Sequence, residues 1–219
     1  MSVREKFDYE LNTAQGQLIA LSNMAIDALE KSVDALVNHD IDAALRVIED
    51  DADINMLEEE INDRVILMIA KQSPVATDLR RLIVTIKVAS DLERVGDYAV
   101  NIAKETIRIG KDDLVAPIEQ INIMRELAIT MLRKVIEAFI EEDIVKAKEI
   151  AALDDQLDDL YGDSIRKLLK AGAENPEKLG QITQLAFVSR YMERSGDHAT
   201  NVAEQLFYLV RGKHYDLNS

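Results

Sequence analysis

The sequence predicts an all-α protein made of two tandem, internally repeated three-helix bundles, six long helices in total. Hydrophobic residues recur with helical spacing through most of the 219-residue chain. Turn and strand formers are scarce: there are 8 glycines, 3 prolines and no tryptophan, and aromatic residues make up 5%. A motif within the third predicted helix also recurs within the sixth, which indicates a duplication.

The breaks in the helical pattern divide the chain into six segments. All three prolines, Pro74, Pro117 and Pro176, lie at these breaks, where a helix has to start or stop. Asn175 is expected to cap the last helix, with Pro176 at its first position. The predicted helices are residues 5–37, 40–71, 76–109, 117–141, 143–171 and 177–211.

The internal repeat can be followed through the second and third predicted helices of the unit. The segment that starts at Asp40 matches one that starts at Asp143, and Pro74 matches Pro176. The segment 93–103 matches 193–203 at an offset of 100 residues, whereas the second helices match at 103. Because the offset changes only across predicted loops, we expect two equivalent units, residues 1–112 and 113–219.

The third helix of each unit carries an apolar seam whose members alternate by four and three positions. This is the spacing by which long helices pack side by side in bundles. The seams are Val88, Leu92, Val95, Ala99 and Ile102 in the first unit, and Val188, Met192, Ser195, Ala199 and Val202 in the second.

Composition excludes several classes of function. The chain has no cysteine, which rules out disulfides, thiolate nucleophiles and cysteine-ligated zinc or iron–sulfur sites. A net charge of −15 disfavours nucleic acid and anionic lipid as partners. No apolar run reaches the roughly 18 residues of a membrane span, and the amino terminus lacks the apolar core of a secretory signal. We therefore expect a soluble cytoplasmic protein without membrane insertion.

A polar stripe runs along the shoulder of each seam at i, i+4 and i+8. Two like charges at i and i+4 cost about 0.2–0.5 kcal/mol, and the mid-helix glycines Gly96 and Gly196 cost roughly 1 kcal/mol each compared with alanine. Since both costs occur twice, we expect compensation from outside the helix, with each glycine admitting a neighbouring backbone or a coordinated ion. The stripes are Glu93, Asp97 and Asn101, and Glu193, Asp197 and Asn201.

The second helix of each unit supplies matching oxygen ligands. Asp51 and Asn55 are four residues apart, and Asp154 and Asp158 occupy the equivalent positions. Neighbouring helices of a bundle can bring these pairs to the carboxylate stripes. Oxygen ligands without histidine or cysteine suit Mg²⁺, Mn²⁺, Ca²⁺ or iron rather than soft metals.

A purely structural interpretation stays open beside the metal site. Arg94 and Arg194 can pair with neighbouring carboxylates as surface ion pairs worth about 0–1 kcal/mol. The run 58–60 is typical of a solvated face, and His39, His198 and His214 are not spaced as ligands. Recurrence of the motif with the same arginine, glycine and asparagine favours metal binding.

Three segments resemble the PhoU family of regulators of bacterial phosphate uptake: Gln72–Arg80, Asp91–Asp97 and Met192–Asp197. The resemblance covers essentially the whole chain. It implies two three-helix bundles, usually dimeric, with metal clusters of iron, manganese, magnesium or zinc on Asp/Glu-x-x-x-Asp motifs. Asn55 departs from that pattern, because it stands where the family places a carboxylate.

The resemblance also implies a non-enzymatic adaptor that links the ATPase subunit of a phosphate ABC transporter to a phosphate-sensing histidine kinase, with negative regulation when phosphate is plentiful. A rival interpretation is a carboxylate-bridged di-metal enzyme of ferritin-like type, which needs Glu-x-x-His pairs that this chain lacks. A third interpretation is a purely structural helical scaffold. The second unit offers four carboxylates, whereas the first offers three and Asn55. We therefore expect the second metal site to be the better occupied.

Overall fold

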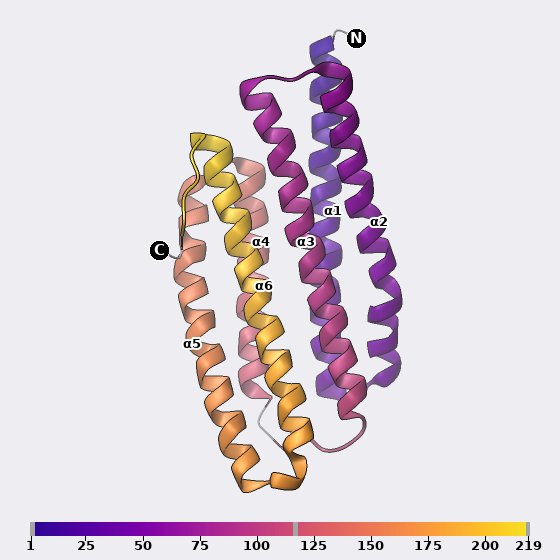
Figure 1. The fold of residues 1–219 in the computed structure, drawn as a ribbon, viewed down its shortest axis with the longest axis vertical. Coiled ribbons are helices and arrows are strands. Elements are labelled where there is room, and N and C mark those ends of the chain that lie inside the picture. The colour runs from indigo at the N-terminus through magenta and orange to yellow at the C-terminus, as the bar shows by residue number, and fades with distance from the viewer. Residues whose placement is uncertain (1–2, 116–117, 218–219) are drawn as a thin grey trace.

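A computed structural model describes residues 3–115 and 118–217 of the chain. Within these residues the predicted all-α fold is confirmed, with helices separated by short connections (Figure 1). The elements in order are α1 (Val3–Asn38), α2 (Ile41–Gln72), α3 (Ala76–Ile109), α4 (Glu119–Glu141), α5 (Ile144–Glu174), the 3₁₀ turn η1 (Pro176–Lys178) and α6 (Leu179–Arg211).

The helices form two three-helix units that lie side by side (Figure 1). Helices α1–α3 form one unit and α4–α6 the other, while α3 and α6 pack against each other in antiparallel orientation at the centre. Helix α1 also contacts α4. One continuous cluster of buried apolar side chains runs through both units, so the two bundles share a core. The boundary predicted between residues 112 and 113 lies in the connection from α3 to α4.

Both predicted seams are confirmed as the centre of this core. Every seam residue of α3 and of α6 is fully buried, including Ser195, whose hydroxyl donates to the Tyr191 carbonyl at 2.8 Å. Burying a serine this way satisfies its polar group within its own helix. The carboxylate stripes therefore stand on helices whose orientation is fixed by close packing along the adjacent seam.

The turn after the first helix of each unit repeats in atomic detail. His39 and Glu142 both adopt the left-handed conformation, with φ of 53° and 52°. The amide of the following residue, Asp40 or Asp143, donates to a carbonyl five residues back at 2.9 Å, a Schellman ending. Each of these aspartates then caps the next helix through its side chain. The duplication inferred from sequence is thus preserved in the backbone.

The predicted end of the fifth helix is wrong, because helix α5 continues to Glu174, three residues beyond it. Pro176 stands at the first position of the next helical turn, as predicted, but Asn175 precedes that turn without a side-chain cap and is also the residue that ends α5. Its side-chain amide donates to the Ala171 carbonyl at 3.0 Å, and Pro176 opens the short turn η1. The predicted start of the fourth helix, residue 117, lies outside the described residues, and α4 begins at Glu119.

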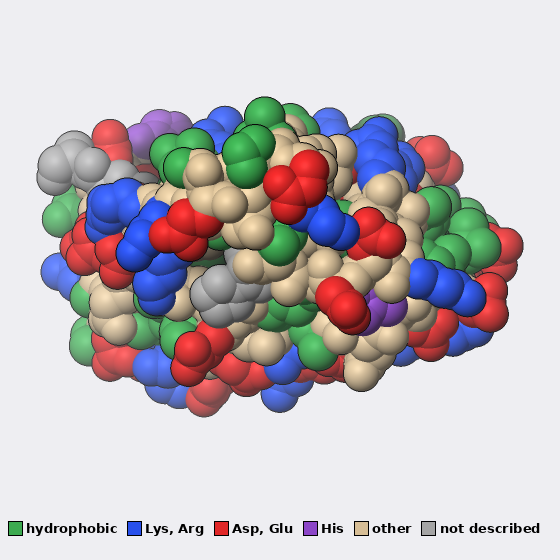
Figure 2. Space-filling view, turned by 90° about the horizontal axis from the view of Figure 1, so that it is seen from below, with side chains coloured by type: hydrophobic (Ala, Val, Ile, Leu, Met, Phe, Trp, Pro, Cys, Tyr) green, Lys and Arg blue, Asp and Glu red, His purple; other side chains and the backbone are tan. Residues whose placement is uncertain are grey.

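The surface is strongly charged but mixed in sign. Figure 2 shows acidic and basic side chains interspersed over the end of the molecule that carries the α1–α2, α3–α4 and α5–α6 connections. Among the helices of residues 3–115 and 118–217, none has an 18-residue stretch apolar enough to cross a membrane.

Candidate metal centre

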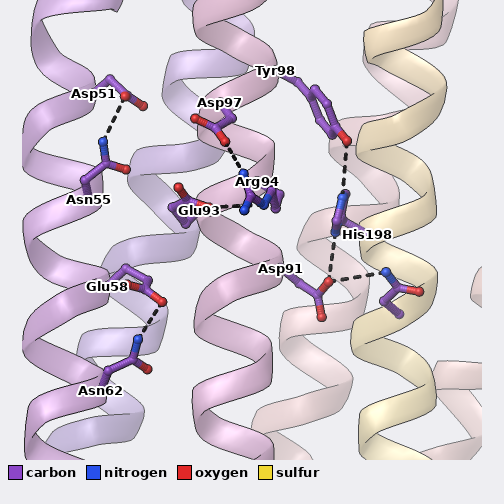
Figure 3. Close-up of polar contacts among 11 residues, drawn as sticks. Asp51, Asn55, Glu58, Asn62, Asp91, Glu93, Arg94, Asp97, Tyr98 and His198 are labelled. Carbon is purple, nitrogen blue, oxygen red and sulfur yellow. Dashed lines mark hydrogen bonds and ion pairs between the residues drawn. The ribbon is translucent and has the colours of Figure 1, made fainter.

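In the first unit, polar side chains of α2 and α3 lie on the sides of the two helices that face each other (Figure 3). Asp51 and Asn55 point from α2 toward α3, while Glu93 and Asp97 point back toward α2. The Asn55 amide donates to Asp51 Oδ2 at 3.1 Å. Glu58 lies on the same face of α2, so the structure adds a sixth polar side chain to the five predicted for this unit, one that the sequence interpretation assigned to solvent.

The mid-helix glycines permit this approach. A Cβ on Gly96 would lie 3.0 Å from Ile54 Cδ1 and 3.5 Å from Asp51 Oδ1. A Cβ on Gly196 would overlap the Leu157 Cδ2 methyl and lie 3.5 Å from Asp154 Oδ1. Each glycine therefore makes room for side chains of the second helix of its unit, not for a backbone. In both units one of these side chains is an aspartate.

The second unit repeats the arrangement with deeper burial. Asp154 of α5 is 3% exposed and Glu193 of α6 is 8% exposed, so both carboxyl groups belong to the interior. Asp197 is half-buried beside them, whereas Asp158, one turn along α5 from Asp154, is exposed. Arg190 Nη1 donates to Glu193 Oε1 at 2.6 Å, a partner that the first unit lacks at the equivalent position, Ser90.

Burial and mutual repulsion perturb these carboxyl groups in one direction. Loss of solvent, with the Asp197 charge second, raises the pKa of Glu193 to about 7. Burial likewise raises the pKa of Glu93, where Asp97, Glu58 and Asp51 add repulsion. The pKa values of Asp51, Asp158 and Asp197 are raised for the same leading reason. Each site therefore holds more negative charge than its surroundings stabilise.

Arginines occupy part of each stripe, as the structural interpretation expects. Arg94 Nη1 lies 2.7 Å from Asp97 Oδ2, and Arg194 Nη1 lies 3.5 Å from Asp197 Oδ2. Within residues 3–115 and 118–217, no three His, Asp or Glu side chains converge into a ready-made ligand set. Binding an ion would therefore require the carboxylates to move closer together, with Asp97 and Asp197 giving up their arginine contacts.

The donor set nevertheless fits a hard cation. All the facing groups are carboxylate or amide oxygens, the ligands preferred by Mg²⁺, Mn²⁺ and Ca²⁺. Among the described residues, no hydrogen-bond donor reaches the buried oxygens Asp51 Oδ1, Asn55 Oδ1 or Glu193 Oε2. An acceptor buried without a donor is costly, and a cation between the helices would satisfy it. The residues that would hold it are Asp51, Asn55, Glu93 and Asp97 in the first unit, and Asp154, Asp158, Glu193 and Asp197 in the second.

The two asparagines of the stripes differ in their surroundings. Asn101 is half-buried one turn beyond Asp97. Asn201 is exposed, and its amide donates to Asp91 Oδ1 of the other unit at 3.3 Å. The structure thus gives Asn201 a partner across the α3–α6 interface that its position in the repeat does not predict.

His198 has a structural role that the sequence interpretation missed. Its Nδ1 lies 2.8 Å from Asp91 Oδ1, and its Nε2 lies 3.5 Å from the Tyr98 hydroxyl (Figure 3). Tyr98 also stacks on Tyr191, with ring centroids 5.9 Å apart. The repeat relates position 91 to 191 and position 98 to 198, so Asp91–His198 and Tyr98–Tyr191 are equivalent contacts of a pseudo-twofold interface. The indication in the sequence was that equivalent positions hold unlike residues, Asp91 against Tyr191 and Tyr98 against His198.

We expect Asp91 and His198 to be energetically coupled across this interface. In a double-mutant cycle with Asp91→Ala and His198→Ala, the coupling free energy should be about 1 kcal/mol, the usual net value of an intramolecular hydrogen bond. Urea denaturation of the four proteins measures it. Strict additivity of the two single effects would contradict a direct contact.

The fold and its paired sites define a class: duplicated helical bundles with an acidic stripe in each half. Comparison with known proteins agrees with this class. The PhoU domain matches the chain twice, over residues 18–106 and 121–206. The phosphate-specific transport system accessory protein PhoU homolog of Clostridium acetobutylicum is 36% identical over 216 residues, covering 98% of this chain and 99% of the relative.

Solved structures give the same result. The crystal structure of PhoU from Pseudomonas aeruginosa superposes with a TM-score of 0.90 at 30% identity, covering 94% of this chain and 100% of that one. The phosphate transport system regulatory protein PhoU from Streptococcus pneumoniae gives 0.90 at 29% identity, covering 96% and 99%. The chain belongs to the PhoU family, as the resemblance of its motifs implied.

Proposed function

We propose that this chain is a non-enzymatic regulator attached to a phosphate-specific transport system. Its relatives are named as accessory or regulatory proteins of phosphate transport, and the similarity extends over nearly the full length of both chains. The observation that carries the proposal is the duplicated carboxylate site within this family's fold. The chain lacks the Glu-x-x-His pairs of di-iron enzymes, which favours a regulator over an oxidase.

In this proposal each site binds a hard metal ion, with iron, manganese, magnesium or zinc as candidates. A bound ion would neutralise the facing carboxylates and link α2 to α3, or α5 to α6. The protein then acts in the cytoplasm as a homodimeric adaptor between the ATPase subunit of the phosphate ABC transporter and a phosphate-sensing histidine kinase. The rigid helical surface and mixed surface charge suit such contacts.

Deletion of the gene is expected to raise phosphate-starvation gene expression in phosphate-rich medium. The reason is that a negative regulator of the kinase would be lost. A reporter fused to a starvation-induced promoter measures the effect, and the wild-type gene supplied in trans should reverse it. Unchanged reporter activity in the deletion strain would contradict the signalling role.

The transporter's ATPase subunit should be retained by the immobilised protein, and retention should weaken as salt is raised. Surface charges of this acidic chain would carry the contact, and salt screens exposed charges with a Debye length of about 8 Å at physiological ionic strength. Retention measured between low and high salt tests this. Binding that is insensitive to salt would indicate an apolar contact instead, and absence of binding would remove this partner.

A further inference from the structure

The two units differ at two equivalent positions beside their carboxylates. The 103-residue offset of the second helices relates Glu58 to Tyr161, and the 100-residue offset of the third helices relates Ser90 to Arg190. The first unit therefore has a carboxylate and a hydroxyl where the second has a phenol and a guanidinium. Because the surrounding fold is the same, each unit serves as an internal control for the other.

In the second unit, Arg190 places a positive charge beside the carboxylates of the site. Its guanidinium lies over the Tyr161 ring, 5.6 Å from the centroid, and donates to Glu193 Oε1 at 2.6 Å. Its positive charge also acts on Asp158 and Asp197. Three of the four carboxylates are thus partly neutralised by a side chain that Tyr161 holds in place.

In the first unit, this cation is replaced by an additional acid. Glu58 is half-buried and points from α2 toward α3, and its Oε1 accepts from the Asn62 amide at 2.6 Å (Figure 3). Its charge acts on Glu93. Ser90 is exposed and carries no charge. Each unit also keeps the arginine of its own stripe: Arg94 lies 2.7 Å from Asp97 and 3.7 Å from Glu93, and Arg194 lies 3.5 Å from Asp197.

Glu58 also belongs to a continuous row of oxygens on α2. Residues 51, 55, 58 and 62 are spaced i, i+4, i+7 and i+11, which places them on one face of the helix. Within the described residues, Asp51 Oδ1, Asn55 Oδ1 and Asn62 Oδ1 are buried without a hydrogen-bond donor. Three buried acceptors beside an additional carboxylate suit a cation.

We propose that Glu58 is a metal ligand of the first site, supplying the carboxylate that Asn55 lacks, and that the Tyr161–Arg190 pair competes with metal in the second site. The inference rests on the proposed function, because it takes the carboxylate sites to bind a hard cation. It makes the first site the tighter of the two. That order is the reverse of the one expected from counting carboxylates in the sequence.

Two parent variants separate the sites. Glu193→Gln/Asp197→Asn leaves only the first site, and Glu93→Gln/Asp97→Asn leaves only the second. Equilibrium dialysis against Mn²⁺ alone gives the dissociation constant of each parent, and circular dichroism checks that each variant is folded. The first-site parent should bind more tightly than the second-site parent.

Glu58→Gln in the first-site parent should weaken Mn²⁺ binding by at least about tenfold, since affinity follows the charge of the ligand set. Glu59→Gln, which removes a neighbouring exposed carboxylate, should leave binding unchanged. Arg190→Ser in the second-site parent should tighten binding by about tenfold, because it introduces the first unit's residue and removes the competing cation. Arg211→Ser, at the far end of α6, is the matched control for loss of one positive charge.

The outcomes distinguish this inference from the proposed function. If the wild-type protein binds no Mn²⁺, both proposals are wrong. If it binds at both sites while Glu58→Gln behaves as Glu59→Gln does, only the role of Glu58 is wrong. If Arg190→Ser has the same affinity as Arg211→Ser, competition by Arg190 is wrong, whatever the starvation reporter shows.

Discussion

The metal-free protein should lose unfolding free energy as the pH rises from about 4.5 to about 7, and Glu193→Gln should remove most of that loss. Burial and the Asp197 charge raise the pKa of Glu193 from 4.5 to about 7. In this window the native state keeps a proton that the unfolded state releases, so stability falls with rising pH. The loss is at most on the order of 3 kcal/mol, at about 1.4 kcal/mol per pH unit.

Urea denaturation in EDTA at several pH values measures this slope. Glu59→Gln, which removes an exposed carboxylate from α2, controls for the loss of one acid. Adding Mn²⁺ at neutral pH should restore stability to the wild type, because a cation replaces the proton. A stability that rises between these pH values, or a Glu193→Gln variant with the wild-type slope, would contradict the buried, repelled carboxyl group.

The second large effect is expected at the mid-helix glycine of α6. Gly196→Ala should destabilise the protein by roughly 1–3 kcal/mol, because its Cβ would overlap the fully buried Leu157 side chain. Gly96→Ala should stay within about 1 kcal/mol of wild type, since the tight contact with Ile54 is offset by alanine's helix propensity. Urea denaturation at one pH compares the two variants.

A Gly196→Ala protein at least as stable as Gly96→Ala would contradict this packing. Gly212→Ala offers a separate check on glycine chemistry, because Gly212 ends α6 with φ of 71° and does not touch either site. Its destabilisation would come from the left-handed backbone and from crowding of the Arg80 guanidinium, which would lie 2.9 Å from the added Cβ. That cost should be insensitive to Mn²⁺, whereas the effect at position 196 should change when metal is present.

Much of the fold was predictable because helical periodicity and an internal repeat are properties of the sequence itself. The seams through Leu92 and Met192 follow directly from spacing. The end of α5 was not predictable in this way. Asn175 suits the start of a helix as well as its end, and here its side chain bonds the end of α5 rather than the start of η1.

The candidate site was predictable in part. Spacing placed Glu93 and Asp97 on one stripe, and the repeat indicated Asp51 and Asn55 as the residues of α2 that face them. Neither showed how far along α2 the facing row extends, because that depends on how α2 is rotated. Glu58 was therefore assigned to solvent with its two neighbours, although only Glu59 and Glu60 are exposed.

The internal repeat could not predict the contacts between the two units. His198 looked incidental because its counterpart is Tyr98, yet the two rings contact each other and His198 also bonds Asp91. A duplicated sequence predicts what the units share. The effect of a difference such as Ser90 against Arg190 can be inferred only once the residues that face it from the neighbouring helix are known.

The central claim is that the two carboxylate stripes bind a hard metal ion. It is tested most directly by the metal content of protein purified without chelators, dialysed with Mn²⁺ and measured by mass spectrometry, beside a variant in which Glu93, Asp97, Glu193 and Asp197 are replaced by their amides. We predict Mn²⁺ retained by the wild type and lost from the folded variant. Equal metal content in the two proteins, or none in the wild type, would contradict the claim.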